Sequence, residues 1–541
     1  MESGRLEEGR DAYRRNEWSK AYAVLSALDE VGELGPADLE LLSDVKFMLG
    51  DVVGMIETLE RAHHGYVERG EVLPAGRTAG WLGANYGIAG KAALASGWLE
   101  RAQRLFDQVE EDCVERGYLL LPSAIRKIGE GDLNSAVALA ADAARIGTRF
   151  GDADLVALAG HLQGRALIHQ GSTQEAIRVF DEIMISVTAG RLAPRITGVV
   201  YCGVVECCFL IHDIGRAAEW TGALSGWVDS QPDLVAFTDQ CLAHRSEILR
   251  LGGTWDQAIK EAKLAHVHDA RGLGAAVAAY QLAEIHRLRG ELDLAEEAYR
   301  EAGLRGQEPQ PGLALLRASQ GNLDAAVASI TRAVAESSSP AERAMLRAAQ
   351  IEVLTQQGDL LGAEAAVEEL SAIAEQTGID MHLAWAAAGR ATVALARSEP
   401  DAALPELRDA MRRWQDLNVP YEVGRSRSSL GVALGAIGDG EAADIEFQAA
   451  REIFVELGAE PDVRRIDDLR RGARPDKPHG LTPRELEVLR LLTSGASNRS
   501  IATDLVLSER TIDRHVSNIF TKIGVSSRSA ATAFAIRNQL G

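Results

Sequence analysis

The sequence contains few cysteines and few aromatic residues. Five cysteines occur among 541 residues, without any CxxC spacing, and aromatic residues make up 5% of the chain. These thiols suit neither a disulfide framework nor a zinc site, so we expect them to be buried in a reducing compartment and predict no metal. The low aromatic content argues against a β-rich body. The cysteines are Cys113, Cys202, Cys207, Cys208 and Cys241.

Long hydrophobic runs are missing as well. No apolar stretch approaches the roughly 20 residues that a helix needs to cross a bilayer. The first residues, Met1–Arg5, show no apolar signal segment. We therefore expect a cytoplasmic protein with no membrane partner.

Motifs for nucleotide binding and catalysis are absent too. A phosphate-binding loop at Gly90-Lys91 would require a glycine in place of Asn85 and a serine or threonine in place of Ala92. Asp51 has no apolar strand before it, so a phosphoacceptor domain is not predicted. No acidic residues group with a nucleophile or a base. We predict no cofactor and no enzymatic activity.

The body of the chain is repetitive. Eight glycine–alanine pairs share a spacing of five residues, and the steps between successive members from Ala102 to Ala443 range from 31 to 42 residues. The pairs are Gly97 and Ala102, Gly131 and Ala136, Gly171 and Ala176, Gly253 and Ala258, Gly290 and Ala295, Gly321 and Ala326, Gly358 and Ala363, and Gly438 and Ala443. Weaker members are Asn16 with Ala21, Gly50 with Met55, Asp213 with Ala218, and Ser398 with Ala403.

We interpret each glycine as the turn of a helical hairpin, and each alanine as the point where its helix meets a neighbour. One hairpin cannot bury its own apolar face, whereas stacked hairpins can. The series resembles degenerate tetratricopeptide repeats, whose period is about 34 residues; residues 82–86 are similar to the first-helix pattern of that family. The resemblance implies an all-α fold with an α-solenoid of about 11–12 hairpins. A non-repetitive all-α bundle is the alternative.

Capping residues and glycine stops in residues 481–540 predict four short helices. Thr482, Pro483 and Glu485 give the first helix a capping box with proline at its first position. Serines before the other helices and glycines after the first and third supply further boundaries. The expected caps and stops are Thr482 with Gly495, Ser497, Ser508 with Gly524, and Ser526 or Ser527.

The third of these helices has an apolar and a polar side. Two helices joined by a tight turn, the second with a polar, arginine-bearing face, are what a helix-turn-helix needs to enter the major groove of DNA. On spacing alone, a helical bundle with solvated charges is the alternative. The apolar side carries Ile512, Val516, Ile519 and Ile523, and the polar side carries Arg510, Asp513, Arg514, Ser517 and Thr521.

The residues of this segment resemble the LuxR-type DNA-binding domain. The resemblance covers about 60 residues and implies a bacterial transcription regulator with a helix-turn-helix at about 498–517. It rests on Leu481-Thr482, Arg484-Glu485, Glu487-Val488-Leu489, Gly495, Ser497-Asn498, Ile501-Ala502, Leu505, Ser508, Thr511-Ile512, His515-Val516, Asn518-Ile519, residues 522–525 and Arg528.

The resemblance also implies double-stranded DNA as a partner and a homodimer formed through the fourth helix. Such symmetry predicts an operator with two half-sites. The DNA-binding candidates are Asn498, Arg499, Ser508, Arg510, Thr511, Asp513, Arg514, Ser517, Asn518 and Lys522. The candidates for the dimer interface are Ala530, Ala531 and Phe534.

Asp513 departs from the family, which usually has a lysine at this position. An aspartate could accept a hydrogen bond from cytosine N4, or could hold Arg510 or Arg514 in a fixed pose. A carboxylate that only faced phosphates would weaken binding. We favour the role of holding an arginine, with Arg514 as the direct base contact. Asn498 and Arg499, at a helix N-terminus, are better placed for a phosphate.

Charge divides the chain. Residues 479–541 carry eight basic and five acidic side chains, a balance of +3, so the other 478 residues carry −25 of the net −22. An acidic body repels the phosphate backbone and suits a partner other than DNA, although a merely solubilising surface is equally compatible. The predicted domains are a helical repeat domain (1–460), a basic linker (461–480) and a LuxR-type domain (481–541).

These features favour a DNA-binding regulator whose body binds a signal. A protein or peptide is favoured over a small-molecule ligand. The alternative is a constitutive DNA binder whose solenoid is a scaffold for self-assembly or protein interaction, without ligand sensing.

Overall fold

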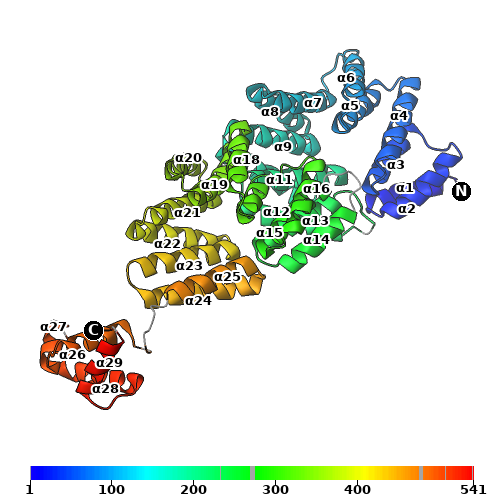
Figure 1. The fold of residues 1–541 in the computed structure, drawn as a ribbon. Helices are drawn as coiled ribbons and strands as arrows, with labels where there is room; N and C mark the ends of the chain where they lie inside the picture. The colour runs from blue at the N-terminus through cyan, green and yellow to red at the C-terminus, as the bar shows by residue number, and fades with distance from the viewer. Residues whose placement is uncertain are drawn as a thin grey trace. The chain divides into compact units, whose positions relative to one another are not determined.

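The computed structural model describes residues 2–231, 233–267, 274–473, 479, 481–505, 507–538 and 540. The regular structure of these residues is helical, in 29 helices (Figure 1), in agreement with the predicted all-α fold. The chain forms two compact units, Met1–Val463 and Arg464–Gly541. The first unit is called the body below, and the second the C-terminal unit.

The body is a stack of antiparallel helical pairs. The described residues contain twelve such hairpins, each formed by an odd-numbered helix and the helix that follows it. They are α1 (Glu2–Arg14) with α2 (Trp18–Glu30), α3 (Pro36–Met48) with α4 (Val52–Glu68), α5 (Val72–Ile88) with α6 (Ala92–Phe106), α7 (Glu115–Glu130) with α8 (Leu133–Phe150), α9 (Ala153–Gln170) with α10 (Thr173–Thr188), α11 (Pro194–Leu210) with α12 (Ile214–Asp229), α13 (Thr238–Leu251) with α14 (Trp255–Val267), α15 (Gly274–Arg289) with α16 (Leu292–Leu304), α17 (Gly312–Ser319) with α18 (Leu323–Glu336), α19 (Pro340–Gln357) with α20 (Leu360–Thr377), α21 (Asp380–Ala396) with α22 (Pro400–Asp416), and α23 (Pro420–Ala436) with α24 (Gly440–Leu457).

Each hairpin turns at a residue with left-handed backbone, a conformation that glycine adopts at little cost. Seven of the eight predicted turn glycines have φ between +77° and +90°, namely Gly131, Gly171, Gly253, Gly290, Gly321, Gly358 and Gly438. Gly50, Asn16 and Ser398 also turn the chain, with φ of 85°, 59° and 62°. The alanines five residues later are buried, because the two helices of the hairpin meet there.

Two of the predicted turn residues are wrong. Gly97 lies inside α6, and the turn is at Gly90, with φ of 71°. The glycine–alanine spacing occurs in both places, so the local pattern could not separate a turn from a helix interior. Between α11 and α12 the left-handed residue is His212, one position before Asp213, whose carboxylate instead caps α12 by accepting from the Arg216 N–H.

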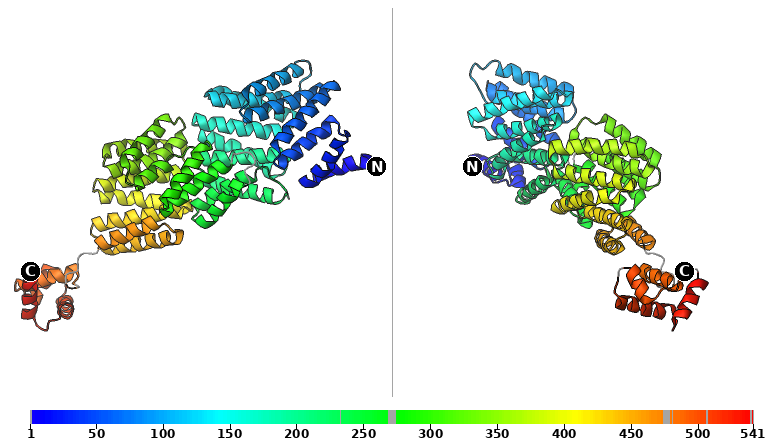
Figure 2. Two further views of the ribbon diagram at one scale, coloured as in Figure 1. Left: turned by 45° about the vertical axis from the view of Figure 1, so that its right-hand side comes forward. Right: turned by 90° about the vertical axis from the view of Figure 1, so that its left-hand side faces the viewer.

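The stack coils so that hairpins far apart in the sequence meet (Figures 1 and 2). The Gln174 amide donates to the Thr377 carbonyl at 2.8 Å, across 203 residues. His212 and His382 share a hydrogen bond of 3.0 Å across 170 residues. Near the N-terminus, the Trp18 indole donates to Gln231 at 3.2 Å. Successive coils of the body are therefore in direct contact.

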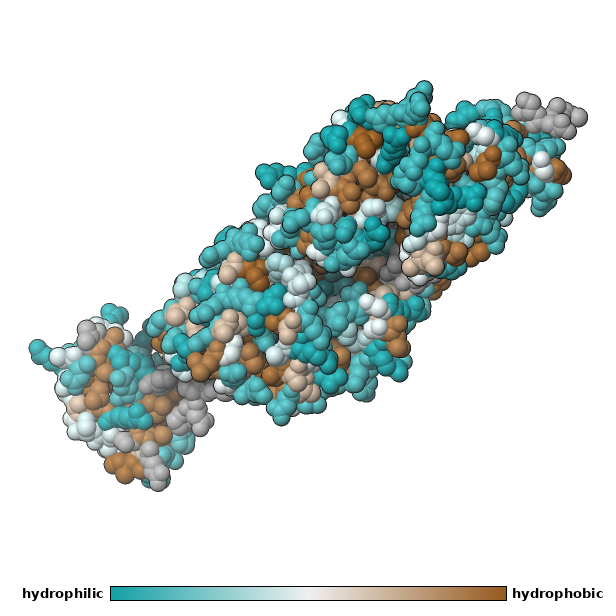
Figure 3. Space-filling view, turned by 90° about the horizontal axis from the view of Figure 1, so that it is seen from above, coloured by the Kyte–Doolittle hydropathy of each residue, from teal (hydrophilic) through white to brown (hydrophobic). Residues whose placement is uncertain are grey.

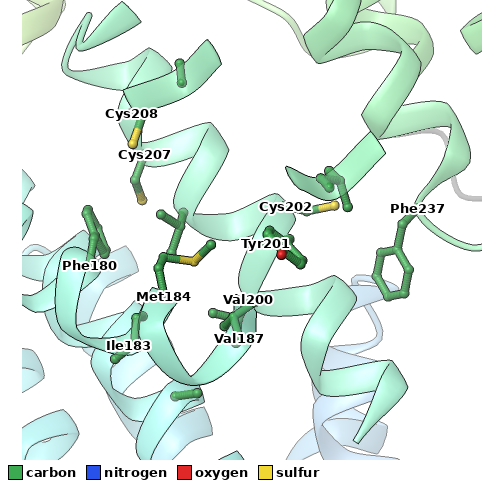
Figure 4. Close-up of a cluster of buried hydrophobic side chains, with 14 of the residues drawn as sticks. Phe180, Ile183, Met184, Val187, Val200, Tyr201, Cys202, Cys207, Cys208 and Phe237 are labelled. Carbon is green, nitrogen blue, oxygen red and sulfur yellow. The ribbon is translucent and has the colours of Figure 1, made fainter. Parts of the chain in front are cut away.

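Between α10 and α11 the core of the body combines aliphatic, aromatic and sulfur-containing side chains. Figure 4 shows Phe180 and Met184 of α10 beside Val200 and Cys207 of α11. All five cysteines are buried as free thiols, as predicted. Burial raises the pKa of the Cys207 thiol to about 12, which makes it unreactive.

The surface of the body is mixed. On the face shown in Figure 3, hydrophilic residues predominate, with hydrophobic ones scattered among them. Of the helices in the described part of the chain, none combines the length and the apolar character that a membrane span requires.

The segment predicted as a basic linker begins as a helix. α25 covers Glu460–Ala473 and crosses the boundary between the two units. Residues 474–478 and 480, in the rest of that segment, lie outside the described residues.

Candidate nucleic-acid interface

The C-terminal unit consists of four short helices whose caps follow the sequence closely. α26 (Pro483–Thr493) starts with the predicted capping box: the Glu485 N–H donates to Thr482 Oγ1, and the Thr482 N–H donates to Glu485 Oε2. The side chains of Ser497, Ser508 and Ser527 cap the other three helices. These are α27 (Asn498–Asp504), α28 (Glu509–Ile523) and α29 (Arg528–Arg537).

One apolar core fixes the four helices to one another. Leu489 and Leu492 of α26, Ile501 of α27 and Ile512 and Ile519 of α28 are essentially inaccessible to solvent. Because α27 and α28 share this core, α28 is held with its opposite side outward. This arrangement is the predicted helix-turn-helix, with α27 as the bracing helix.

The outward side of α28 forms a continuous polar strip, which we call the recognition face. It is defined by Arg510, Asp513, Arg514, Ser517 and Thr521, all of them exposed. Each of them lies three or four residues from another member of the set, which places them on one side of the helix. The face can offer two guanidinium groups, one carboxylate and two hydroxyls to a groove about one helix wide.

Asp513 is held by a neighbouring helix. Its Oδ1 accepts a hydrogen bond from Asn498 Nδ2 at 2.8 Å, and Asn498 Oδ1 accepts one from Arg528 Nη1 at 3.0 Å. Arg528 also donates to the Ala496 carbonyl. The preferred role for Asp513, holding Arg510 or Arg514, is therefore wrong: Asp513 binds Asn498, and both arginines remain available.

A second polar contact anchors the far end of α28. Lys522 Nζ donates to Glu485 Oε2 at 2.6 Å, and the Glu485 side chain is only 4% exposed. Burial raises the pKa of the Glu485 carboxyl, but the hydrogen bonds from Lys522 and Thr482 outweigh burial, so the pKa lies below its ordinary value. Lys522, predicted as a DNA contact, thus holds α28 against α26.

The remaining DNA-binding candidates differ in their availability. Arg499 and Asn518 are exposed, while Asn498 is half-buried with its amide engaged on both sides. At the start of α28, the hydroxyl groups of Ser508 and Thr511 are hydrogen-bonded to each other, with 2.6 Å between their oxygens. Ser508 is exposed and Thr511 is half-buried.

The dimer candidates on α29 need one correction. Ala531 is fully buried in the core of the unit, because its side of α29 packs on the other helices, so its side chain cannot reach a partner. Ala530 and Phe534 are half-buried, and the Phe534 ring contacts His479 with 4.7 Å between ring centroids. Ile536, which no pattern in the sequence indicated, is 66% exposed on the same helix.

Two functional roles could not be predicted from residue type. Arg528 and Glu485 belong to the resemblance, yet their parts in bracing depend on partners 30 and 37 residues away. The capping box placed Glu485 at the start of a helix. It gave no indication that the same carboxylate would also bind Lys522.

Comparison with known proteins agrees with this geometry. Residues 479–535 match the family model described as bacterial regulatory proteins, luxR family. This part of the chain is a LuxR-type helix-turn-helix domain, as predicted.

Curated relatives match in the same region. The chain is 50% identical over 60 residues to the transcriptional regulatory protein DegU of Brevibacillus brevis, covering 11% of this chain and 25% of that protein. It is 40% identical over 76 residues to the transcriptional regulatory protein LiaR of Bacillus subtilis (strain 168), covering 14% and 36%. It is 43% identical over 68 residues to the nitrate/nitrite response regulator protein NarP of Escherichia coli (strain K12), covering 13% and 32%. The chain thus spans about a quarter to a third of the length of these relatives.

A solved structure with similarity across the body is that of the APC/C hetero-tetramer Cut9-Hcn1. The alignment covers 86% of this chain and 95% of the solved chain, at 13% sequence identity and a TM-score of 0.42. The hairpin architecture of the body is established by its own helices.

Proposed function

We propose that this chain is a DNA-binding transcription regulator of a bacterial cytoplasm, in which α28 enters the major groove of double-stranded DNA and the body binds a signal. The observation that carries the proposal is the recognition face: exposed arginines on a helix anchored by a shared core, in a domain that matches the LuxR family.

The side chains divide between bases and phosphates. Arg514, at the centre of the recognition face, is assigned to a base edge, because a guanidinium can donate to guanine O6 and N7 together. Arg499 and Asn518, at its margins, are assigned to phosphates, which position the protein without specifying sequence. Asn498 is engaged inside the domain and is assigned to bracing.

A homodimer would place two such helices on one duplex. Ile536, an exposed apolar residue of α29, is proposed for this contact in place of the buried Ala531. The twofold symmetry of the pair would match an operator with two half-sites.

The body is assigned to signal binding because residues 1–478, which include it, carry a net charge of −25 that opposes contact with DNA. Its role is to change how the two C-terminal units are presented to the operator.

The proposal is tested by selecting duplexes from a random pool with the full chain at 0.15 M salt. We expect an enriched motif made of two half-sites. The double variant R510A/R514A should select a motif with fewer specified positions, while a variant at the exposed Arg490 of α26 should select the same motif as the unaltered chain. Binding without any enriched sequence would overturn the assignment of the recognition face.

A further inference from the structure

The body contains a cavity, partly open to solvent, that the DNA-binding function does not use. Its volume is about 780 Å³, which lies in the range of small-molecule sites. Its lining comes mainly from odd-numbered helices between α11 and α23, which the contact between His212 and His382 helps to close into a ring. Gly253, before α14, also lies against Pro420 of α23, so closely that a Cβ at this position would be 2.8 Å from Pro420 Cγ.

One part of this lining is apolar. Phe209, Met345, Ala348 and Trp385 come from α11, α19 and α21. Phe209 stacks on His244 with 5.4 Å between ring centroids, and Trp385 stacks on His382 at 5.9 Å. Stacking fixes the rings, so an apolar ligand would meet a surface that is already formed.

The charged part of the lining has an excess of carboxylates. Seven glutamates and four arginines line the cavity. Burial lowers the pKa of His244 to about 4 and lowers the pKa of His212 as well, so these imidazoles add no positive charge at neutral pH. The cavity therefore favours a cation over an anion.

The arginines of the lining are engaged by the protein itself. Arg425 binds Glu352 at 2.6 Å and Glu422 at 3.3 Å, and Arg287 binds Glu284 at 2.7 Å. Arg305 binds Glu301 at 3.2 Å, so three of the four guanidinium groups are paired with carboxylates, whereas Arg250 binds the neutral amide of Gln281.

Glu247 differs from the paired glutamates. It lies one helical turn from Arg250 on α13, but Arg250 Nε donates to Gln281 Oε1 at 2.5 Å instead. Burial raises the pKa of Glu247, and Arg250 and Gln281 offset this only in part. A cation from a ligand would stabilise this carboxylate.

We propose that the cavity binds an amphipathic cation, with its apolar part against Phe209 and Trp385 and its ammonium or guanidinium group at Glu247. The cation can belong to a free amine or to a basic side chain of a peptide. The proposal deepens the proposed function, since it names the chemistry of the signal, but ligand binding can be measured without DNA.

The test uses three indoles with the same ring and different charge: tryptamine, N-acetyltryptamine and indole-3-propionate. Calorimetry on the full chain should give a dissociation constant for tryptamine at least about tenfold lower than for indole-3-propionate. E247Q should remove this preference, and E297Q, at an exposed glutamate of α16, should keep it. Tighter binding of a short tryptophan–lysine peptide than of tryptamine would identify a peptide as the source of the cation.

Equal binding of the three indoles, tighter binding of the carboxylate, or no binding of tryptamine would each overturn the proposal. A preference that persists in E247Q would overturn the assignment of the cation to Glu247. None of these results depends on whether the chain recognises an operator.

An independent observation on α28 supports a second inference. The hydrogen bond from Asn498 fixes Asp513 on the recognition face and uses one of its two carboxylate oxygens. A carboxylate retains further acceptor capacity in that state. Arg528 in turn fixes Asn498, so the position of Asp513 is determined by α27 and α29 as well as by α28.

We infer that Asp513 determines specificity by accepting a hydrogen bond from the N4 amino group of a cytosine. Thymine offers an acceptor at the equivalent place and would repel the carboxylate. The inference rests on the proposed function, because it requires sequence-specific binding by α28.

Selection from random duplexes should give a cytosine at one fixed position of each half-site for the unaltered chain. D513A should lose the preference at that position alone and should bind the best site about tenfold more weakly. N498A should weaken the preference at that position and leave the preferences at the other positions of the half-site unchanged, which a general loss of bracing would not produce.

An unchanged preference at every position in D513A would overturn the inference. So would an equal gain of affinity for operator and random DNA, because the carboxylate would then only repel phosphates. Absence of any selected motif for the unaltered chain would instead contradict the proposed function.

Discussion

At the scale of single residues, Glu485 connects two helices of the C-terminal unit. Its carboxylate accepts from the N–H of Thr482 at the start of α26 and from Lys522 near the end of α28. Removing this carboxylate would remove both the hydrogen bond that caps α26 and the contact that holds α28 against α26.

We expect E485A to lower the stability of the C-terminal unit by about 2 kcal/mol at neutral pH, from the lost cap and the lost charged hydrogen bond. The pKa of Glu485 is lowered in the folded state, so its contribution is complete above the ordinary value of 4.5 and disappears as the pH falls through the lowered pKa. The difference between the unaltered chain and E485Q should therefore vanish in acid.

Hydrogen exchange of the α26 amides is the suitable measurement, because the last tryptophan of the chain is Trp414 and fluorescence would report only on the body. A difference that stays the same in acid would show that the charge of Glu485 is not what stabilises the cap.

Arg514 provides a test of direct contact with a base. R514A should lose about 1–3 kcal/mol of discrimination at one base pair of the operator. Competition binding with single-base operator variants measures this, and R490A, at an exposed arginine of α26, serves as the control. An equal loss on random DNA would identify Arg514 as a phosphate contact.

At the scale of helices and turns, the hairpins of the body depend on left-handed residues, but these turns differ in their surroundings. Gly131 has φ of 77° with open space around it, whereas Gly253 has φ of 82° and lies against Leu457 and Pro420. The second turn also joins two coils of the body.

G131A should cost about 1–2 kcal/mol, the strain of an L-residue in this conformation. G253A should cost about 1–3 kcal/mol more, because its Cβ would lie 2.7 Å from Leu457 Cδ2 and must displace the neighbouring coil. Urea unfolding followed by circular dichroism compares the two. Equal midpoints would mean that the coils do not pack as described.

The helix α29 presents Ile536 at the surface proposed for dimerisation. I536E should weaken self-association of the full chain about tenfold or more, since burying an isoleucine contributes about 1.5–3 kcal/mol. Sedimentation measures this, with V455E as the control at a comparably exposed residue of α24. If V455E and I536E behave alike, the contact does not involve α29.

At the scale of the whole molecule, the charge differs along the chain, with +3 over residues 479–541 and −25 over residues 1–478. This division suits a body that binds something other than DNA. Signal sensing further requires that binding at the body and binding at the C-terminal unit be coupled.

Coupling has a strict consequence. Tryptamine should change the affinity for the operator by the same factor as the operator changes the affinity for tryptamine. Titrations of each ligand at zero and saturating concentrations of the other measure both factors. If tryptamine binds and both factors equal one, its binding does not affect DNA binding, and the chain behaves as a constitutive DNA binder towards this ligand.

Much of the fold follows from signals within a few residues of one another. The capping box of Thr482 and Glu485 and the turn glycines such as Gly358 are local, and the structure confirms them. Gly97 was misassigned because Gly90 and Gly97 carry the same spacing. Ala531 was misassigned because helical periodicity does not tell which alanine of α29 faces the core.

The sequence by itself determined the helices, their ends and the presence of a LuxR-type domain, since caps, turns and apolar periodicity act within one or two helical turns. Only the tertiary structure decided that the coils of the body meet through His212 and His382, that they enclose a cavity, and that Asp513 binds Asn498. These contacts join residues 170 and 15 positions apart, on helices whose relative placement is set by packing of the whole core. No pattern local to either partner specifies that packing.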